Sequence, residues 1–242
     1  MRFLGIDFGW QGKPSGLASL DWNGRGLRLV SMERRTTLDD VLAWVDRESL
    51  GGPSLVAVDA PTVIRNAAGM RTADRLMHTH FGRYHAGCYP ANLGRPYAAR
   101  TNQLGASLEL LGFGHAAVIT PRQPGRYQIE VHPHAATVQL FDLDRIIKYK
   151  KGPLEGRRAE LSRYRHLLLT RLKALRPQLA LSDLPAIPAR GAALKELEDQ
   201  MDGVLCAYIG AHWWYWGLER NLVCGSSAEG YIVVPGREAG SI

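Results

Sequence analysis

Residues 1–60 carry short apolar runs that alternate with polar turns, a pattern typical of strands that pack on a core. The runs predict strands at residues 2–8, 16–21, 26–31 and 54–59. A helical spacing of apolar residues follows Thr37, at Leu38, Val41, Leu42 and Val45. Because threonine is a good N-cap, this spacing predicts a helix with either Thr36 or Thr37 as its N-cap.

The order of these elements predicts a sheet topology. Three successive strands with short connections should form an antiparallel meander. A crossover helix should then place the fourth strand beside the first and parallel to it. Asp7 and Asp59 close the first and fourth apolar runs, so we expect both at the same carboxyl edge. Ligands bind at that edge in open α/β sheets.

The rest of the chain is less regular. It predicts helices at residues 71–81, 98–111, 155–175 and 192–219, and strands at 127–131 and 230–235. We therefore expect an α/β protein with a mixed sheet, three antiparallel strands and then parallel ones, and flanking helices. Its 242 residues fit one domain over 1–242. That domain would contain a loop-rich insertion around 62–97 and a basic helical segment around 145–176.

Acidic residues end or follow several of the predicted elements. Asp7, Asp59 and Glu130 belong to strands, and Asp199 and Asp202 lie three residues apart in the last helix. A buried strand has no structural use for an unpaired carboxylate, because burying a charge is costly. Carboxylates that meet would repel unless a cation lies between them. Oxygen ligands of this kind suit Mg²⁺ or Mn²⁺, so the pattern indicates a metal-assisted site.

Charge is concentrated in one segment. The net charge is +7, but residues 145–176 hold eleven Lys or Arg and two Glu, which gives +9 there and −2 elsewhere. Such a block indicates an anionic partner, with nucleic acid as the leading candidate, or else a solvated helix face. The residues expected to bind phosphate are Lys148, Lys150, Lys151, Arg157 and Arg158.

Several motifs together resemble a known family. They are Gly5-Ile-Asp7, Val58-Asp59-Ala-Pro61, Glu130-Val-His-Pro133, Tyr149-Lys-Lys151 and the predicted helix at 198–207. Their order is similar to that in a family of predicted nucleases, the domain-of-unknown-function family numbered 429. The strand order also resembles the ribonuclease H-like fold, which includes retroviral integrases and Holliday-junction resolvases.

The resemblance implies a function and assigns roles. It implies a metal-dependent nuclease that hydrolyses phosphodiester bonds by a two-metal carboxylate mechanism, with Mg²⁺ or Mn²⁺ as cofactor. Asp7, Asp59, Glu130 and Asp202 would be catalytic, and the metal ligands would be Asp7, Asp59, Asp199 and Asp202. Glu130 belongs to the narrower family and has no fixed counterpart in the wider fold. Partner contacts would be to the nucleic-acid backbone and independent of sequence.

Two other functions fit the same residues. A nucleic-acid or nucleotide binding protein could keep the fold without turnover. The Gly-rich segment 8–16 after the first strand is similar to the phosphate loop of actin-like ATPases and sugar kinases. That segment lacks the P-loop pattern, and no second copy of the meander is evident.

Three smaller features have alternative interpretations. His78, His80, His85 and Cys88 could bind zinc, but their spacing matches no usual finger. Segment 87–100 mixes tyrosine with arginine, so it either contacts a base and a phosphate or is an ordinary surface loop. Residues 213–216 hold three tryptophans, which we expect to be buried or to form a homo-oligomer contact.

Localisation is predicted from what the sequence lacks. No apolar run is long enough to span a membrane. The first apolar run is short and reaches Asp7 too early for a signal peptide. Three cysteines without a CxxC pair indicate reduced thiols. We therefore expect a cytoplasmic protein with no membrane partner.

Overall fold

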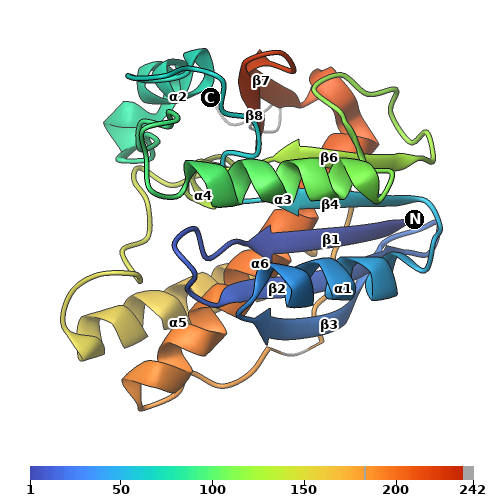
Figure 1. Ribbon diagram of the computed structural model, residues 1–242. Helices are drawn as coiled ribbons and strands as arrows, with labels where there is room; N and C mark the ends of the chain where they lie inside the picture. Colours follow the sequence, from blue (N-terminus) through green and yellow to red (C-terminus); the bar gives the residue numbers. More distant parts are fainter. Residues whose placement is uncertain (183, 237–242) are drawn as a thin grey trace.

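The computed structural model describes residues 1–182 and 184–236 and shows a mixed α/β architecture (Figure 1). In chain order the elements are β1 (Arg2–Asp7), β2 (Ser15–Trp22), β3 (Leu27–Arg35), α1 (Leu38–Ser49), β4 (Ser54–Val58), α2 (Thr72–Phe81), η1 (Gly82–Tyr84), α3 (Ala98–Leu110), β5 (Gly114–His115), β6 (Arg126–Glu130), α4 (Pro133–Leu140), α5 (Leu154–Arg171), α6 (Gly191–Trp216), η2 (Gly217–Glu219), β7 (Asn221–Ser226) and β8 (Gly230–Pro235).

The main sheet has six strands in the order β3-β2-β1-β4-β6-β5. β1 pairs antiparallel with β2, and β2 with β3, so the predicted meander is confirmed. β4 pairs parallel with β1, with Ile6 opposite Val58, as the crossover helix predicted. β6 continues the parallel half beside β4, with Val58 opposite Glu130. Three strands therefore end at one edge, each with an acid at or next to its last residue.

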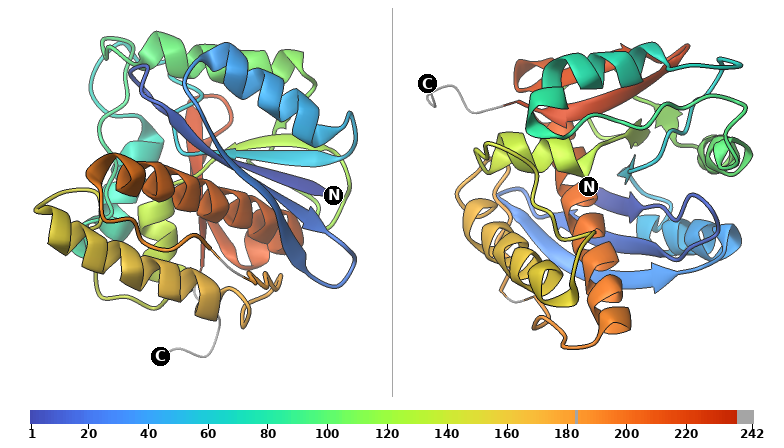
Figure 2. Two further views of the ribbon diagram at one scale, coloured as in Figure 1. Left: turned by 90° about the horizontal axis from the view of Figure 1, so that it is seen from below. Right: turned by 90° about the vertical axis from the view of Figure 1, so that its left-hand side faces the viewer.

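Helices cover both faces of this sheet (Figures 1 and 2). α1 and α3 pack on one face, where Leu4, Ile6 and Trp44 belong to one buried cluster. α6 crosses the other face against β1 and β2, and α5 packs on α6. Helix α1 begins as predicted, because the Thr37 side chain accepts a hydrogen bond from the backbone N–H of Asp40. No helix in the described part of the chain is long and apolar enough to cross a membrane.

Several elements were not foreseen, among them α4, β5 and β7. α4 is nearly apolar on every side, so its sequence has no helical periodicity, although Pro133 suits its first turn. The two-residue strand β5 is too short to leave a pattern. β7 contains Gly225 and forms a separate hairpin with β8 that packs against α2. The basic segment 145–176 is helical only over α5, so its first nine residues are irregular.

The tryptophans at the end of α6 contribute to the core. Trp213 and Trp214 are buried, as expected, and their indole N–H groups donate to the carbonyl oxygens of Ala116 and Gln123 at 2.9 Å each. Trp216 is half-buried and donates to the carbonyl of Arg176. A homo-oligomer contact in this region stays a prediction.

Candidate active site at the carboxyl ends of the parallel strands

Asp7 and Asp59 lie side by side at the carboxyl edge of the sheet. Asp7 is the last residue of β1, and Asp59 follows the last residue of β4. The backbone N–H of Asp59 donates to the carbonyl of Ile6 at 2.8 Å, which fixes the register between the two strand ends. Their side chains are 13% and 18% exposed, so both carboxylates remain open to a cavity.

Helix α6 brings a third carboxylate, that of Asp202, to the same place. The helix approaches the sheet very closely, because a Cβ on Gly5 would overlap the carbonyl of Gly203 and one on Gly16 would overlap Asp199. Asp202 is fully buried. The hydroxyl of Tyr149 donates to Asp202 Oδ1 at 2.6 Å.

A lysine ammonium lies between these carboxylates. Lys150 Nζ is 2.8 Å from Asp202 Oδ2 and 3.9 Å from Asp7 Oδ2. Burial opposes the charge on Lys150, but Asp202, Asp7 and Asp59 outweigh burial and raise its pKa well above the usual range. Burial raises the pKa of Asp7 well above its usual value, with Asp202 and Asp59 adding to the rise and Lys150 opposing it. We call Asp7, Asp59, Asp202 and Lys150 the open cluster.

Two histidines flank the open cluster. His132 Nδ1 is 3.8 Å from Asp59 Oδ1. Burial would raise the pKa of Asp59, but the close approach of His132 and nearby positive charge lower it. Burial also lowers the pKa of His132, yet Cys88 and Asp59 outweigh it and raise that pKa well above its usual range. Burial, with Lys150 and His132, lowers the pKa of His134 to about 4. The sequence showed both histidines but gave them no role.

Glu130 lies in the same cavity, but its carboxylate is already bound. Arg71 Nη2 and Nη1 donate to Glu130 Oε1 and Oε2 at 2.6 and 2.8 Å. The same guanidinium donates to Asp74 Oδ1 at 2.8 Å. Burial opposes the charge on Arg71, but Glu130 and Asp74 outweigh burial and raise its pKa. We call Arg71, Asp74 and Glu130 the closed cluster, and the sequence gave no sign of Arg71 or Asp74.

Asp199 is also engaged elsewhere. Arg34 Nη2 is 3.0 Å from Asp199 Oδ2, and Lys195 Nζ is 2.6 Å from Asp199 Oδ1. Neither Asp199 nor Asp202 lines the cavity, but Asp202 shares the ammonium of Lys150 with Asp7, which does line it. Of the two acids in α6, the structure therefore brings Asp202 to the other carboxylates and gives Asp199 two cationic partners on the flank.

The predicted phosphate-binding residues divide into two groups. Lys148, Lys150 and Lys151 line the cavity. Arg157 instead pairs with Glu198 at 3.3 Å, and Arg158 donates to the carbonyl of Pro188 at 3.1 Å. The irregular start of the basic segment thus reaches the site, and its helical part stabilises the packing around α6.

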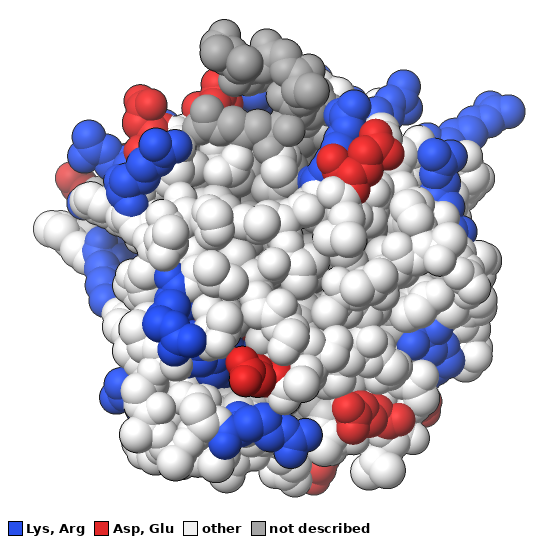
Figure 3. All heavy atoms as spheres, turned by 90° about the horizontal axis from the view of Figure 1, so that it is seen from above, with Lys and Arg blue, Asp and Glu red and all other residues white. Residues whose placement is uncertain are grey.

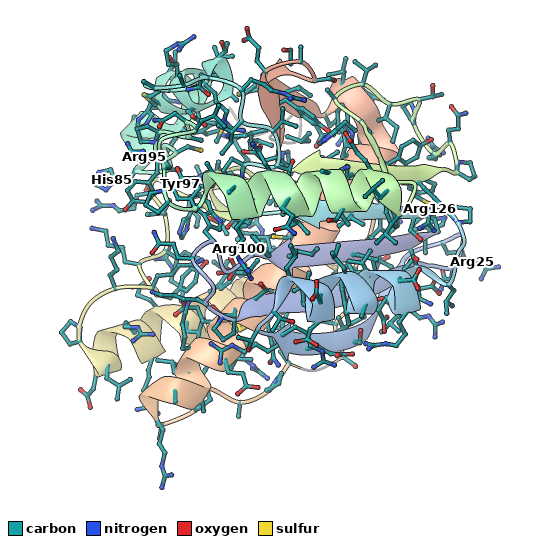
Figure 4. All side chains as sticks on the ribbon, viewed as in Figure 1. Arg25, His85, Arg95, Tyr97, Arg100 and Arg126 are labelled. Atoms are coloured by element: carbon teal, nitrogen blue, oxygen red, sulfur yellow. The ribbon has the colours of Figure 1, made fainter. Side chains whose placement is uncertain are left out.

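The cavity has a volume of about 810 Å³ and lies at the end of the sheet where β1 and β4 finish. Figure 4 shows His85, Arg95, Tyr97 and Arg100 at this end, with Arg25 and Arg126 at the other. Figure 3 shows a different face, over α2 and the β7–β8 hairpin, where charges of both signs lie mainly around the rim.

The donor chemistry suits a hard cation, although the arrangement is not a finished metal site. Asp7, Asp59 and Asp202 converge, burial raises the pKa of Asp7, and the ammonium of Lys150 supplies the positive charge between the carboxylates. Within residues 1–182 and 184–236, no group of three His, Cys, Asp or Glu is arranged to hold a metal ion. The predicted zinc candidates include His78, whose Nε2 is 2.7 Å from the carbonyl oxygen of Cys88.

A comparison with models of protein families identifies the family of the chain. The model of a protein family of unknown function, DUF429, matches residues 5–221. The chain belongs to the DUF429 family. The match runs from β1 to the first residue of β7, so the DUF429 region contains both the open and the closed cluster. No curated protein and no solved structure matches the chain.

Proposed function

We propose that this DUF429 protein is a metal-dependent nuclease of ribonuclease H-like fold. The observation that carries the proposal is the convergence of Asp7, Asp59 and Asp202 around one cation, at the edge where parallel strands end. Supporting it is the sheet, in which an antiparallel meander precedes a fourth strand parallel to the first. A site built for structure alone would have little reason to gather three carboxylates around one partly exposed lysine.

Asp7, Asp59 and Asp202 would hold Mg²⁺ or Mn²⁺. The ion would stabilise developing negative charge and lower the pKa of a water. His132 keeps Asp59 ionised, and Tyr149 fixes the orientation of Asp202.

Lys150 has a second task in this proposal. Its ammonium neutralises the carboxylates in the resting protein and becomes free to contact a phosphate once they bind another cation. Lys148 and Lys151, which are exposed beside it, would hold the nucleic-acid backbone. These contacts read no bases, so affinity would be independent of sequence.

A second candidate is a nucleic-acid or nucleotide binder without turnover. The observation that favours it is the ion pair between Lys150 and Asp202, which neutralises a buried carboxylate without metal. In that case the open cluster would be a permanent ion-pair network. The two candidates differ in whether a divalent cation displaces Lys150.

Cleavage assays separate the candidates. Wild type, Asp7→Asn and Asp46→Asn are incubated with single-stranded, duplex and hybrid oligonucleotides in Mn²⁺ and in chelator. Asp46 is an exposed acid on α1 and serves as the matched control. We expect Mn²⁺-dependent cleavage that Asp7→Asn abolishes and Asp46→Asn keeps. If wild type cleaves none of the substrates, the binding protein without turnover is the better candidate. If Asp7→Asn still cleaves, the site assignment is wrong.

A further inference from the structure

The cavity at the open cluster has a mixed lining. Carboxylates, buried apolar side chains and exposed lysines all line it. The apolar lining residues include Ala60, Pro61, Val131, Ile147 and Ile232. The volume of about 810 Å³ falls within the range of roughly 300–1,000 Å³ that small-molecule sites occupy. A site of this size and lining suits a ligand with one apolar, flat part and one anionic part.

Tyr89 is an exposed aromatic residue in this lining. It is 72% exposed, although it borders the cavity. An exposed ring on a mobile loop would signify little, but both neighbours of Tyr89 are held. The carbonyl of Cys88 lies 2.7 Å from His78 Nε2, and the carbonyl of Pro90 accepts from the Tyr97 hydroxyl at 2.9 Å.

More contacts fix the same segment. Arg95 Nε donates to the Pro90 carbonyl at 3.2 Å, and the backbone N–H of Ala91 donates to Asp74 Oδ2 at 2.9 Å. Asp74 belongs to the buried closed cluster, so Tyr89 is tied to a rigid part of the fold. A ring presented in this way has the properties of a platform on which a base stacks.

The exposed lysines of the lining come from two separate segments. Lys13 lies in the loop between β1 and β2, and Lys148 and Lys151 lie between α4 and α5. All three are exposed and line the cavity. None of them forms an ion pair with any residue in the described ranges. They are available for the anionic part of a ligand.

The depth of the carboxylates in the cavity favours unpaired over paired nucleic acid. Asp7 and Asp59 line the cavity and are only 13% and 18% exposed, so a phosphate must enter the cavity to reach them. A nucleotide in a duplex must leave its stack to do so, which costs a few kcal/mol, whereas an unpaired nucleotide avoids most of that cost.

We propose that the cavity takes one unpaired nucleotide unit of a nucleic acid, with its base on Tyr89 and its phosphate between the lysines and the open cluster. Its role in cleavage rests on the proposed nuclease function, but binding can be measured alone. The source of the unit is a single-stranded nucleic acid.

Binding is measured by fluorescence anisotropy in Ca²⁺, with gels of the same samples to follow cleavage. The probes are a labelled single strand, the blunt duplex of the same sequence and, as competitor, a free mononucleotide. The variants are Tyr89→Ala, Tyr89→Phe and Leu93→Ala. Leu93 is exposed on the same segment but does not line the cavity, so it is the matched control.

We expect wild type to bind the single strand more tightly than the blunt duplex. Tyr89→Ala should weaken that binding roughly 5- to 150-fold, the range for loss of one stacked base, while Tyr89→Phe and Leu93→Ala stay near wild type. Mononucleotide should compete, and competition as strong as that of the strand would make a free nucleotide the source of the same unit. Equal binding of duplex and single strand, or unchanged binding by Tyr89→Ala, would overturn the proposal.

The outcomes distinguish this inference from the nuclease proposal. Tight, Tyr89-dependent binding without cleavage in Mn²⁺ would support the nucleotide site in the cavity and would reject the proposed nuclease function. If the enzyme prefers to cleave duplex and Asp7→Asn abolishes that cleavage, the nuclease function is supported and the site for an unpaired nucleotide is rejected. Because Tyr89 is exposed, circular dichroism should show all three variants folded like wild type.

Discussion

The closed and open clusters place buried carboxylates in the same cavity but neutralise them differently. In the closed cluster, the planar guanidinium of Arg71 binds both oxygens of Glu130 and one of Asp74 in a fixed geometry. In the open cluster, one ammonium on a flexible stem serves three carboxylates and touches only Asp202 closely. Arginine holds such a geometry, whereas lysine can leave it with little rearrangement. We infer that the closed cluster supports the fold and the open cluster exchanges its cation.

The largest effect should come from breaking the closed cluster. Arg71→Met leaves Glu130 and Asp74 buried without their counter-charge. Loss of one partner from a buried ion pair destabilises by about 3–5 kcal/mol. Denaturant unfolding in chelator should show this loss, and Mn²⁺ should not restore it. A variant as stable as wild type would show that the closed cluster does not stabilise the fold.

Removing the cation of the open cluster should cost less. Lys150→Met should lower the free energy of unfolding in chelator by about 1–3 kcal/mol, below the range for fully buried pairs because the ammonium is 29% exposed. Mn²⁺ should restore the stability of this variant and bind it more tightly than it binds wild type, since nothing competes. Titration calorimetry and melting curves measure both. If Mn²⁺ rescues neither variant, the distinction between the clusters fails.

Acidification tests the neutral histidine beside the open cluster. The pKa of His134 is about 4 in the folded protein and near its usual 6.5 in the unfolded chain. Between these values the unfolded chain binds the proton and the folded protein does not, so stability falls as pH falls. His134→Gln should lessen the loss between pH 7 and pH 5 by about 1–2 kcal/mol. Parallel pH curves for wild type and variant would argue against a neutral, buried His134.

The smallest effect concerns Asp7 and has the opposite sign. Burial and the neighbouring carboxylates raise the pKa of Asp7, so its charge at pH 7 costs the folded state free energy. Asp7→Asn in chelator should therefore be as stable as wild type or up to about 1 kcal/mol more stable, a trade of function against stability. Melting well below wild type would make Asp7 a structural hydrogen-bonding residue.

The sequence predicted the sheet edge well, because β1 and β4 are short apolar runs that each end at or just before an acid. Asp7 and Asp59 could be placed from that pattern and from the crossover helix alone. Asp199 and Asp202 could not be separated in the same way, because an i, i+3 pair lies on adjoining faces of a helix. Which of the two acids reaches the open cluster depends on how α6 packs on the sheet.

The partners of the acids depend on contacts that no local pattern records. Arg71 and Glu130 are 59 positions apart, and Arg71 precedes a short helix in an irregular region. Lys150 was expected to contact phosphate because it lies in a basic block, yet its charge is directed at Asp202. Side-chain pairing over long separations is a product of the whole fold, and the periodicity of a segment does not contain it.

The site depends on the lack of side chains at two glycines, because α6 approaches the sheet very closely there. Gly5 and Gly16 leave no room for even a methyl group between strand and helix. A mutation to alanine at either position would push the helix outward and carry Asp202 away from Asp7. Every charged residue of the site would then still be present in the sequence while the site itself was dismantled. Function here can be lost by adding a carbon, with no change to any residue that a motif search would inspect.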